Sequence, residues 1–512
     1  MRIAIFHGFL LRGTGSNVYN AKLAEALRAA GHEVHLLCQE RSPQDLPWVD
    51  AVGTWRDGVL EVEVIREPVR ATVYRPDIGS LLPVYVADRY EGFEARPLPD
   101  CTDEEIEHYL DANVAALREV VARARPQAAL ANHLVMGPVI MRRAGLAYAV
   151  KVHGSALEYV VKPHPDRFLP YAREGLEGAR TVLVGSLHTG QSLWDAVGGD
   201  VRERTRLGPP GVDIEQFGPR TPQAAADGLR ALAQRLAAEA PADDAAGGDA
   251  FAIDHAAAGR ALGQLDALRD RLVAFTGKLI VSKGVDLLVA AWPLVLSAVG
   301  DAKLVVVGFG AYREGLEALQ AALAAGDADR ARDIARRGRE LEGGPVTPLR
   351  HLLAFLDTVD EGYWAAAARL PDRIVWCGRL EHAELADVLP ACEAQVVPST
   401  FPEAFGMVAA EAAACGTLPV SAAHSGLAEV SRVLAAAVPA DAARLLSFGL
   451  NDDAVRELAD RLVGWLGAPE SLRAPTRQAL VATAREHFSW AGVADGVIAA
   501  AEGRLDALAP PR

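Results

Sequence analysis

The chain has 512 residues, of which 50% are hydrophobic, and a formal net charge of −15 at pH 7. This length exceeds that of one ordinary hydrophobic core and predicts two or more domains. The acidic balance argues against nucleic acid as a partner, and no apolar run approaches the roughly 18–20 residues that cross a membrane.

The cysteines and the first residues indicate the compartment. The cysteines are odd in number and lack metal-ligand spacing, which predicts a reduced, cytoplasmic protein. They are Cys38, Cys101, Cys377, Cys392 and Cys415. Residues 1–11 run into a glycine-rich loop without a cleavage site, so they predict a buried strand and not a signal peptide. Most of the negative charge follows residue 210, so the N-terminal half is compatible with contact to an anionic surface, such as a membrane in peripheral association, or to an anionic substrate.

The first elements predict the start of a doubly wound α/β domain. An apolar strand at 2–7 leads into a glycine-containing loop, which allows the backbone to approach a ligand phosphate. Ser16 or Asn17 is predicted to cap a helix over 18–30. A second strand follows at 33–38.

The same start is open to another interpretation, a dinucleotide-dependent oxidoreductase. Glu40 lies where such enzymes place a ribose-binding acid. The third glycine of G-x-G-x-x-G falls at Val18, however, so this fingerprint is incomplete and the alternative is weakened.

The rest of the N-terminal half predicts further strands that end in polar residues. Residues 41–100 predict irregular strands and loops. Such a region is suited to form an acceptor pocket, because its residues can vary without disturbing the sheet. A helix and three strands are then predicted at 104–124, 128–131, 147–152 and 181–184.

His153 follows the strand at 147–152, and open α/β sheets place ligands at such strand ends. A hydrogen-bonded structural histidine is equally compatible with this position. Ser186 and His188 follow the next strand and are predicted to line the same cleft.

The second half predicts another α/β set with two insertions. Residues 208–219 read as a stiff connector, and residues 221–265 as an inserted helix pair around a mobile loop at 240–249. Lys278 and Lys283 flank a strand-to-helix loop after a strand at 272–276, an arrangement that suits a diphosphate because it combines point charge with helix amides.

Residues 311–371 exceed an ordinary α/β connection and predict a second, helical insertion. Asp327 and Asp329 formally match a D-x-D metal pattern, but their alternating-charge context predicts a solvated helix face. Residues 425–429 predict a glycine turn, and the chain is predicted to be helical from Asp452 to its end, with a break at 488–490.

The segment 401–416 carries the strongest signal. It predicts a loop that follows a strand at 394–397 and leads into a helix whose amides suit a phosphate. Glu403 lies on the loop and Glu411 inside the helix, so two carboxylates are available for the hydroxyls of a sugar and a ribose. A pair of solvated glutamates is the simple alternative.

Together these motifs resemble the retaining nucleotide-sugar glycosyltransferases of the GT-B fold, in family 4. The resemblance extends over nearly the whole chain. It is carried by Gly13–Ser16, His153-Gly154, Pro210–Asp213 with Phe217, Gly277-Lys278, Lys283-Gly284, Pro398-Ser399, the E-x₇-E pair Glu403 and Glu411, and Phe488–Trp490.

The resemblance implies an α/β fold of two Rossmann-like domains that face a cleft and close about a hinge at 208–210. The implied domains are an acceptor-side domain at 1–208, a nucleotide-sugar-binding domain at 209–485, and a C-terminal helix at 486–512 that crosses back to the first domain.

The resemblance also implies roles for individual residues. Lys283, with Lys278, neutralises the diphosphate; Lys278 stands where the family usually has Arg, so it keeps the charge but lacks the bidentate fork. Glu403 contacts the donor sugar, Glu411 the ribose, and His153 approaches the sugar. The remaining implied donor contacts are Gly15, Ser16, Gly277, Gly284, Arg379, Leu380, Ala404, Phe405 and Gly406.

The implied reaction transfers a hexosyl-type sugar with retained configuration by a front-face mechanism, without a metal or other cofactor. A uridine diphosphate sugar is the favoured donor, and a small-molecule or lipid-linked hydroxyl is the acceptor. A nucleotide-sugar epimerase, or another relative of this fold that does not transfer, is the main alternative. A catalytically dead binding module is disfavoured by intact Lys283, Glu403 and Glu411.

Overall fold

The computed structural model describes residues 1–13, 15–86, 92–239 and 254–511. The chain divides into two compact units, unit 1 (Met1–Gly211 and Phe488–Arg512) and unit 2 (Val212–His487). Thr14 of the predicted glycine loop and the centre of the first predicted insertion, at 240–249, lie outside the described residues.

Unit 1 is built on a nine-stranded sheet in the order β11-β10-β9-β8-β1-β2-β5-β3-β4. Neighbouring strands are parallel except for the antiparallel pair β3 and β4. The strands are β1 (Arg2–Phe6), β2 (Glu33–Leu37), β3 (Ala51–Arg56), β4 (Val59–Val64), β5 (Ala71–Arg75), β8 (Ala128–Asn132), β9 (Tyr148–Val152), β10 (Ala179–Val184) and β11 (Thr205–Leu207).

Three of these strands correct the prediction for residues 41–100. The sequence predicts irregular strands and loops there; strands are present, but β5, β3 and β4 extend the main sheet in regular register. Val59 and Val64 of β4 are 63% and 50% exposed, since this strand lies at the sheet edge and its apolar pattern is weak. A separate parallel pair is formed by β6 (Leu81–Val84) and β7 (Glu94–Pro97).

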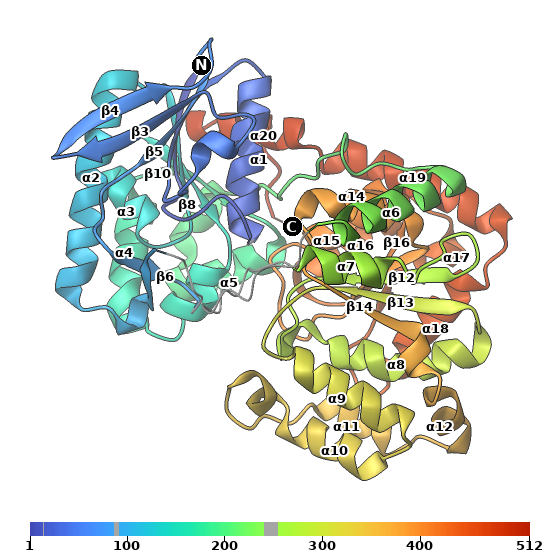
Figure 1. The fold of residues 1–512 in the computed structure, drawn as a ribbon. Coiled ribbons are helices and arrows are strands. Elements are labelled where there is room, and N and C mark those ends of the chain that lie inside the picture. Colours follow the sequence, from blue (N-terminus) through green and yellow to red (C-terminus); the bar gives the residue numbers. More distant parts are fainter. Residues whose placement is uncertain (14, 87–91, 240–253, 512) are drawn as a thin grey trace. The chain divides into compact units, whose positions relative to one another are not determined.

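Helices cover both faces of the unit 1 sheet, as expected when successive side chains of a parallel strand are all buried. Ile3 and Ile5 of β1 belong to one apolar cluster, and Ala4 and Phe6 belong to another. The C-terminal helix α20 packs beside α1 on the first of these faces (Figure 1). The helices are α1 (Gly15–Ala29), α2 (Asp103–Ala124), α3 (Gly137–Arg143), α4 (Pro165–Glu177), α5 (Leu187–Val197) and α20 (Trp490–Glu502).

The start of α1 differs from the prediction. The helix begins at Gly15, so Ser16 and Asn17 lie inside its first turn and the predicted cap is wrong. The Asn17 amide instead donates to the carbonyl of Arg12 at 2.7 Å, and its Oδ1 lies 3.0 Å from Nε2 of His7. These bonds fix the glycine loop to the end of β1.

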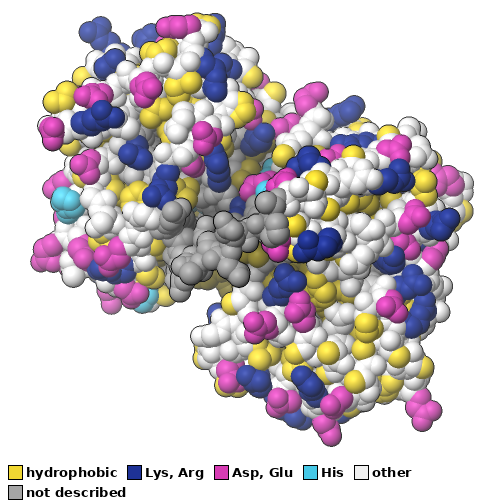
Figure 2. Space-filling view, in the orientation of Figure 1, with side chains coloured by type: hydrophobic (Ala, Val, Ile, Leu, Met, Phe, Trp, Pro, Cys, Tyr) yellow, Lys and Arg dark blue, Asp and Glu magenta, His cyan; other side chains and the backbone are white. Residues whose placement is uncertain are grey.

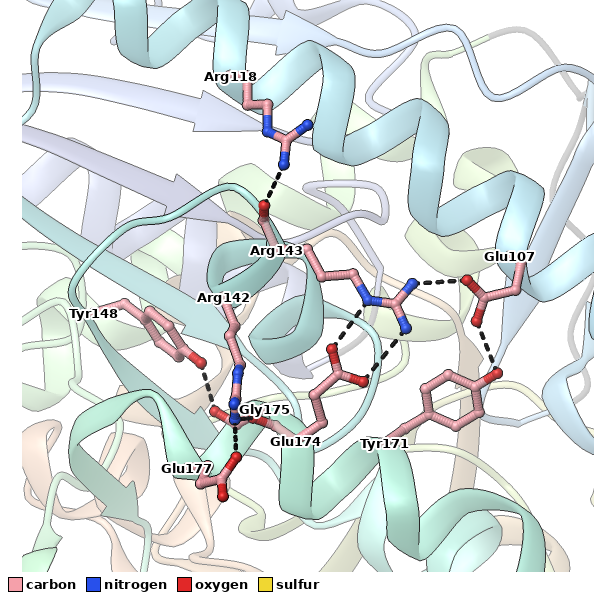
Figure 3. A network of polar contacts seen from close by, with 9 residues as sticks. All are labelled: Glu107, Arg118, Arg142, Arg143, Tyr148, Tyr171, Glu174, Gly175 and Glu177. Carbon is pink, nitrogen blue, oxygen red and sulfur yellow. Dashed lines mark hydrogen bonds and ion pairs between the residues drawn. The ribbon is translucent and has the colours of Figure 1, made fainter.

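Arg143 joins three helices of unit 1 (Figure 3). Its guanidinium donates to Glu107 of α2 at 2.7 Å and to both carboxylate oxygens of Glu174 of α4 at 3.0 and 3.3 Å. The hydroxyl of Tyr171 donates to the other oxygen of Glu107 at 3.0 Å. Planar two-point pairing of this kind orients the helices as well as attracting them.

We expect Arg143→Ala to lower the free energy of unfolding by about 1 kcal/mol. The loss stays small because the Arg143 side chain is 29% exposed and solvent screens its ion pairs. Thermal unfolding followed by circular dichroism measures the effect. Arg123→Ala, at an exposed position of α2, the helix that carries Glu107, is the control, and an equal shift in both variants would contradict the role of Arg143.

Unit 2 is built on a parallel sheet in the order β14-β13-β12-β15-β16-β17. The predicted strand at 394–397 is reproduced residue for residue. The strands are β12 (Arg271–Thr276), β13 (Ala302–Val307), β14 (Ile374–Gly378), β15 (Ala394–Val397), β16 (Leu418–Ala422) and β17 (Ser447–Phe448).

The helices of unit 2 confirm that both predicted insertions are helical. The first contains the packed pair α6 (Pro222–Ala237) and α7 (His255–Leu262). Helices of the second gather beside α8 (Figure 1). The other helices are α8 (Val285–Ala298), α9 (Arg313–Ala324), α10 (Ala328–Arg337), α11 (Arg350–Leu356), α12 (Glu361–Ala367), α13 (Leu370–Arg373), α14 (Leu385–Val388), α15 (Met407–Ala414), α16 (Ser425–Ala435), α17 (Ala440–Ala443), α18 (Ala454–Leu466) and α19 (Glu470–His487).

The predicted glycine turn at 425–429 is wrong, because helix α16 begins at Ser425. A Cβ on Gly426 would lie 2.6 Å from the backbone nitrogen of Phe405, so this glycine permits a close backbone approach. The break predicted near 488–490 is confirmed between α19 and α20.

Surface charge and helix hydrophobicity indicate which partners the chain can contact. Figure 2 shows basic and acidic side chains interspersed over the face in view, so the charge there is mixed. Within the described residues, no helix has both the length and the apolar character to span a membrane.

Candidate functional site

Three loops of unit 2 that follow parallel strands carry most of the residues that the sequence singles out. These loops are Gly277–Gly284 after β12, Gly308–Tyr312 after β13 and Pro398–Gly406 after β15. The carboxyl ends of parallel strands share one edge of a sheet, which is where open α/β sheets bind ligands. The three loops therefore form one candidate site.

A short 3₁₀ turn, η5 (Val281–Lys283), carries Lys283. Gly284 follows with φ of +65°, a conformation that favours glycine. A Cβ on Gly284 would lie 2.0 Å from the carbonyl oxygen of Pro398. Glycine is therefore required after Lys283, because the β12 loop passes directly against the β15 loop and leaves no room for a side chain.

Lys283 forms an ion pair with Glu403 across these loops. The hydroxyl of Ser399 donates to the same carboxylate oxygen at 2.6 Å. Burial raises the pKa of Glu403, but the ammonium of Lys283 and the hydrogen bonds from Lys283 and Ser399 outweigh it and hold the pKa below its ordinary value. At neutral pH the carboxylate is therefore ionised and accepts hydrogen bonds only.

The backbone around Glu403 is fixed by residues that the sequence analysis did not assign to the site. The amide of Glu403 donates to Oγ of Ser425 at 2.9 Å, and its carbonyl accepts from the amide of Gly426 at 2.9 Å. Nε2 of His424 donates to the carbonyl of Ser399 at 2.7 Å, so Nδ1 accepts from the Ser425 hydroxyl at 3.0 Å. The start of α16 thus positions Glu403.

The loop then turns into helix α15 at Gly406, which has φ of +126°. A Cβ there would lie 2.7 Å from Cδ2 of Leu427, so a larger residue meets α16. Ala404 and Gly406 are half-buried and Phe405 is buried. The predicted donor contacts of this segment therefore lie between the Glu403 carboxylate and the amino end of α15.

Glu411 lies inside α15, as predicted, and is 4% exposed. Its Oε1 accepts a hydrogen bond from Nε2 of His382 at 2.8 Å. The ring of His382 in turn packs at 5.0 Å from that of Phe217. His382 was missed by the sequence analysis, although its position three residues after Arg379 in the loop that follows β14 was a usable signal.

Two further predicted donor residues border this loop. The guanidinium of Arg379 lies 5.4 Å from the ring centre of Phe309, and its side chain is 12% exposed. Leu380 is 7% exposed. Arg379 also pairs with Glu381 at 3.3 Å, so its charge is held in place beside an aromatic face.

Gly277 and Lys278 open the β12 loop. Gly277 has φ of +155°, and Lys278 is half-buried. A Cβ on Gly308 would lie 2.0 Å from the carbonyl oxygen of Gly277, so the β13 loop is also held close by a glycine.

His153 belongs to unit 1, where it follows β9. Its Nε2 lies 2.7 Å from Oδ1 of Asn132, whose amide nitrogen donates to the carbonyl of Phe6 at 3.1 Å. Because that bond fixes the Asn132 oxygen as the acceptor, Nε2 of His153 carries the proton and Nδ1 is left to accept. Burial, followed by the neighbouring His133 and Lys151, holds the pKa of His153 well below its ordinary value.

Two more histidines lie beside His153. The ring of His133 is 4.9 Å from that of His153 and 5.6 Å from that of His7. Burial lowers the pKa of His7 to about 4 and that of His133 well below its ordinary value. This polar cluster is therefore neutral at physiological pH.

The remaining predicted residues of unit 1 differ in their environment. Gly15 is exposed and Ser16 is half-buried at the start of α1. Ser186 is buried and caps α5 by accepting from the amide of Thr189 at 3.2 Å, so its side chain has a structural role. His188 is half-buried in the first turn of α5.

The D-x-D pattern is explained by a helix. Asp327 caps α10 by accepting from the amide of Arg330 at 3.0 Å, and the side chain of Asp329 is fully exposed. Across the described residues, no group of three or more His, Cys, Asp or Glu side chains is arranged to hold a metal ion.

Comparison with known proteins adds two family models. Residues 14–211 match the glycosyl transferase 4-like domain, and residues 360–443 match the glycosyl transferases group 1. A D-inositol 3-phosphate glycosyltransferase of Segniliparus rotundus is 32% identical over 264 residues, which cover 51% of this chain and 46% of that protein. A protein of the same name from Rhodococcus erythropolis is 44% identical over 119 residues, covering 22% and 23%. The chain thus spans less than half the length of these relatives.

Solved structures show the fold. Sucrose-phosphate synthase from Thermosynechococcus elongatus has a TM-score of 0.57 at 20% identity, with 99% of this chain and 98% of that one covered. Anabaena Alr3699/HepE in complex with UDP-glucose has a TM-score of 0.55 at 15% identity, with 99% and 100% covered. These neighbours have the GT-B fold, so the predicted fold class is confirmed.

Proposed function

Since the chain belongs to the glycosyl transferases group 1, we propose that it moves a hexosyl-type sugar from a nucleoside diphosphate sugar to an acceptor hydroxyl. The observation that carries this proposal is the Lys283–Glu403 ion pair, which joins two loops that approach closely at Gly284. It provides a cation for a leaving diphosphate and, next to it, an ionised acceptor for sugar hydroxyls.

The groups around this ion pair suggest how the nucleotide sugar binds to unit 2. The diphosphate binds the ammonium of Lys283, with further charge from Lys278 and amides of the loop Ala404–Gly406. Because Glu403 is ionised, it accepts from donor hydroxyls and does not act as a general acid. For unit 1 we keep the sequence-based proposal that His153 contacts the donor sugar; its Nδ1 is the ring nitrogen left to accept, because Nε2 is bound to Asn132.

We place the reaction in the retaining, front-face class, without a metal. The leaving phosphate takes the proton of the acceptor hydroxyl, so no side chain serves as nucleophile. Glu403 is already bound by Lys283 and Ser399, which suits a positioning role better than attack on the sugar. Lys283 stabilises the charge that develops on the diphosphate as the glycosidic bond breaks.

A uridine diphosphate sugar is the first donor to test, because the HepE neighbour was solved with UDP-glucose. D-Inositol 3-phosphate, which the names of the sequence relatives contain, is the first small acceptor to test. Lipid-linked hydroxyls form the second acceptor class. The five cysteines are free and buried, which favours a reducing compartment such as the cytosol.

Glu411 offers the ribose contact in this proposal. We expect Glu411→Ala to lower kcat/KM for the donor by roughly 10- to 100-fold, the effect of losing one charged hydrogen bond. The buried carboxylate and its His382 partner explain the size of the loss. Glu314→Ala, at an exposed glutamate in the first turn of α9, is the control. Equal activity of both variants with the unmodified protein would contradict the assignment.

A mass-spectrometric donor screen tests the function. Purified protein is incubated with UDP-, GDP- and ADP-sugars and an acceptor library, in the presence and absence of EDTA. We expect release of one nucleoside diphosphate together with an acceptor heavier by one hexosyl residue, and the same rate with EDTA. Isomerisation of the donor sugar without any glycosylated acceptor would instead indicate a nucleotide-sugar epimerase.

A further inference from the structure

The second insertion reaches the loop that carries Lys283. A 3₁₀ turn, η6 (Arg339–Glu342), follows α10 in this insertion. One carboxylate oxygen of Glu342 accepts a hydrogen bond from the backbone amide of Val281 at 2.7 Å. Val281 is the first residue of η5, the turn that ends at Lys283.

The amide of Val281 needs such a partner. The first amides of a helical turn have no partner within the turn and are usually capped by a nearby side chain. Ile280 occupies the capping position of η5 but has no polar side-chain atom. Glu342, 61 residues away, therefore supplies the cap.

Glu342 is itself held in place. Its other oxygen accepts from Nε of Arg339 at 2.9 Å, and its side chain is 10% exposed. The ion pair with Arg339 also compensates the carboxylate charge, so the cap places little net negative charge near a diphosphate.

A second set of contacts holds the preceding part of the same loop. The amide of Leu279 donates to the carbonyl of Phe309 at 2.7 Å, and the carbonyl of Leu279 accepts from the amide of Tyr312 at 3.0 Å. A Cβ on Gly310 would lie 2.4 Å from the carbonyl oxygen of Leu279. The start of the insertion is thus fixed to residue 279, and Glu342 is fixed to residue 281.

We infer that Glu342 is a positioning residue for the donor site: it caps η5 and so holds Lys283 in the place where the diphosphate binds. This inference rests on the proposed function and assigns a role to the second insertion, which supplies part of the frame of the donor site. Glu342 acts through the turn and does not touch the substrate.

Four variants and the unmodified protein test the inference by calorimetric titration with UDP. Glu342→Ala removes the cap and is expected to weaken UDP binding roughly tenfold, the effect of one unsatisfied amide. Glu342→Gln keeps an acceptor of the same length and is expected to bind within about twofold of the unmodified protein. Glu342→Asp keeps the charge but is one methylene too short, so it is expected to weaken binding as alanine does.

Glu340→Ala is the matched control, because Glu340 lies in the same turn and pairs with Arg337 at 3.1 Å, and among the described residues it forms no hydrogen bond or ion pair with η5. It is expected to leave UDP affinity unchanged. Hydrogen exchange supplies a second reading: peptides covering 279–284 exchange faster in Glu342→Asp, while those covering β15 keep their rate.

The outcomes separate the two proposals. Unmodified protein that binds none of UDP, GDP and ADP overturns the proposed function, and the inference with it. Normal binding by the unmodified protein, together with unchanged UDP affinity in both Glu342→Ala and Glu342→Asp, overturns the inference alone. Equal losses in Glu342→Ala and Glu340→Ala also overturn it, because they reflect damage to the turn η6 and not loss of the cap.

Discussion

Replacing Lys283 by alanine is expected to lower kcat/KM for the nucleotide-sugar donor by roughly 100-fold or more. The ammonium of Lys283 is the cation paired with Glu403. Alanine is too short and carries no charge, so it cannot stabilise the negative charge on the leaving diphosphate. It also leaves the Glu403 carboxylate without its main counter-charge, so burial then raises the pKa of Glu403.

Steady-state assays of UDP release measure this loss. Lys283→Arg keeps the charge and is expected to retain part of the activity. Lys303→Ala is the control, because Lys303 lies at the amino end of β13 and pairs with Asp270 at 2.9 Å. If the activity of Lys283→Ala stayed within threefold of that of the unmodified protein, the assignment of Lys283 to the donor site would be contradicted.

Gly284→Ala is expected to abolish measurable donor use and to lower the melting temperature. A Cβ at this position meets the carbonyl oxygen of Pro398 at 2.0 Å, and a left-handed backbone adds roughly 1–2 kcal/mol for a non-glycine residue. The β12 and β15 loops must then separate, which moves Lys283 away from Glu403.

Gly326→Ala separates these two effects. Gly326 has φ of +68°, nearly that of Gly284, but no atom lies within 4 Å of its Cβ position. Thermal unfolding and UDP-release assays of both variants are compared. We expect Gly326→Ala to lower the free energy of unfolding only by the cost of the left-handed backbone and to keep full activity. Full activity in Gly284→Ala would contradict the close contact of the two loops.

The sequence was sufficient for elements with a strong local pattern. The strand at 394–397 and the helix over 104–124 were predicted almost to the residue, because each combines an apolar run or stripe with clear end signals. In the structure, α2 begins with a capping box in which Thr102 and Glu105 bond reciprocally.

Elements that depend on distant partners were predicted less well. Residues 51–75 form regular strands, because they pair with β2 and with each other, but their apolar alternation is weak. Helix α16 was predicted as a turn because Gly426 follows Ser425. That glycine serves the backbone contact with Phe405, which no local pattern encodes.

The same division applies to the candidate site. The sequence predicted Lys283 and Glu403 as site residues by resemblance, but not that they pair with each other across 120 positions. His382 and Glu342 were missed because their partners, Glu411 and Val281, lie 29 and 61 residues away. The types of residue were readable from the sequence, whereas the bonds that position them required the fold.

We propose that unit 2 binds a nucleoside diphosphate sugar through the Lys283–Glu403 loops. Calorimetric titration of the purified protein with UDP, GDP, ADP and NAD tests it most directly. We predict saturable binding of at least one nucleoside diphosphate, lost in Lys283→Ala, and no comparable binding of NAD. Saturable binding of NAD with none of the three nucleoside diphosphates would contradict the claim and favour a dinucleotide-dependent oxidoreductase.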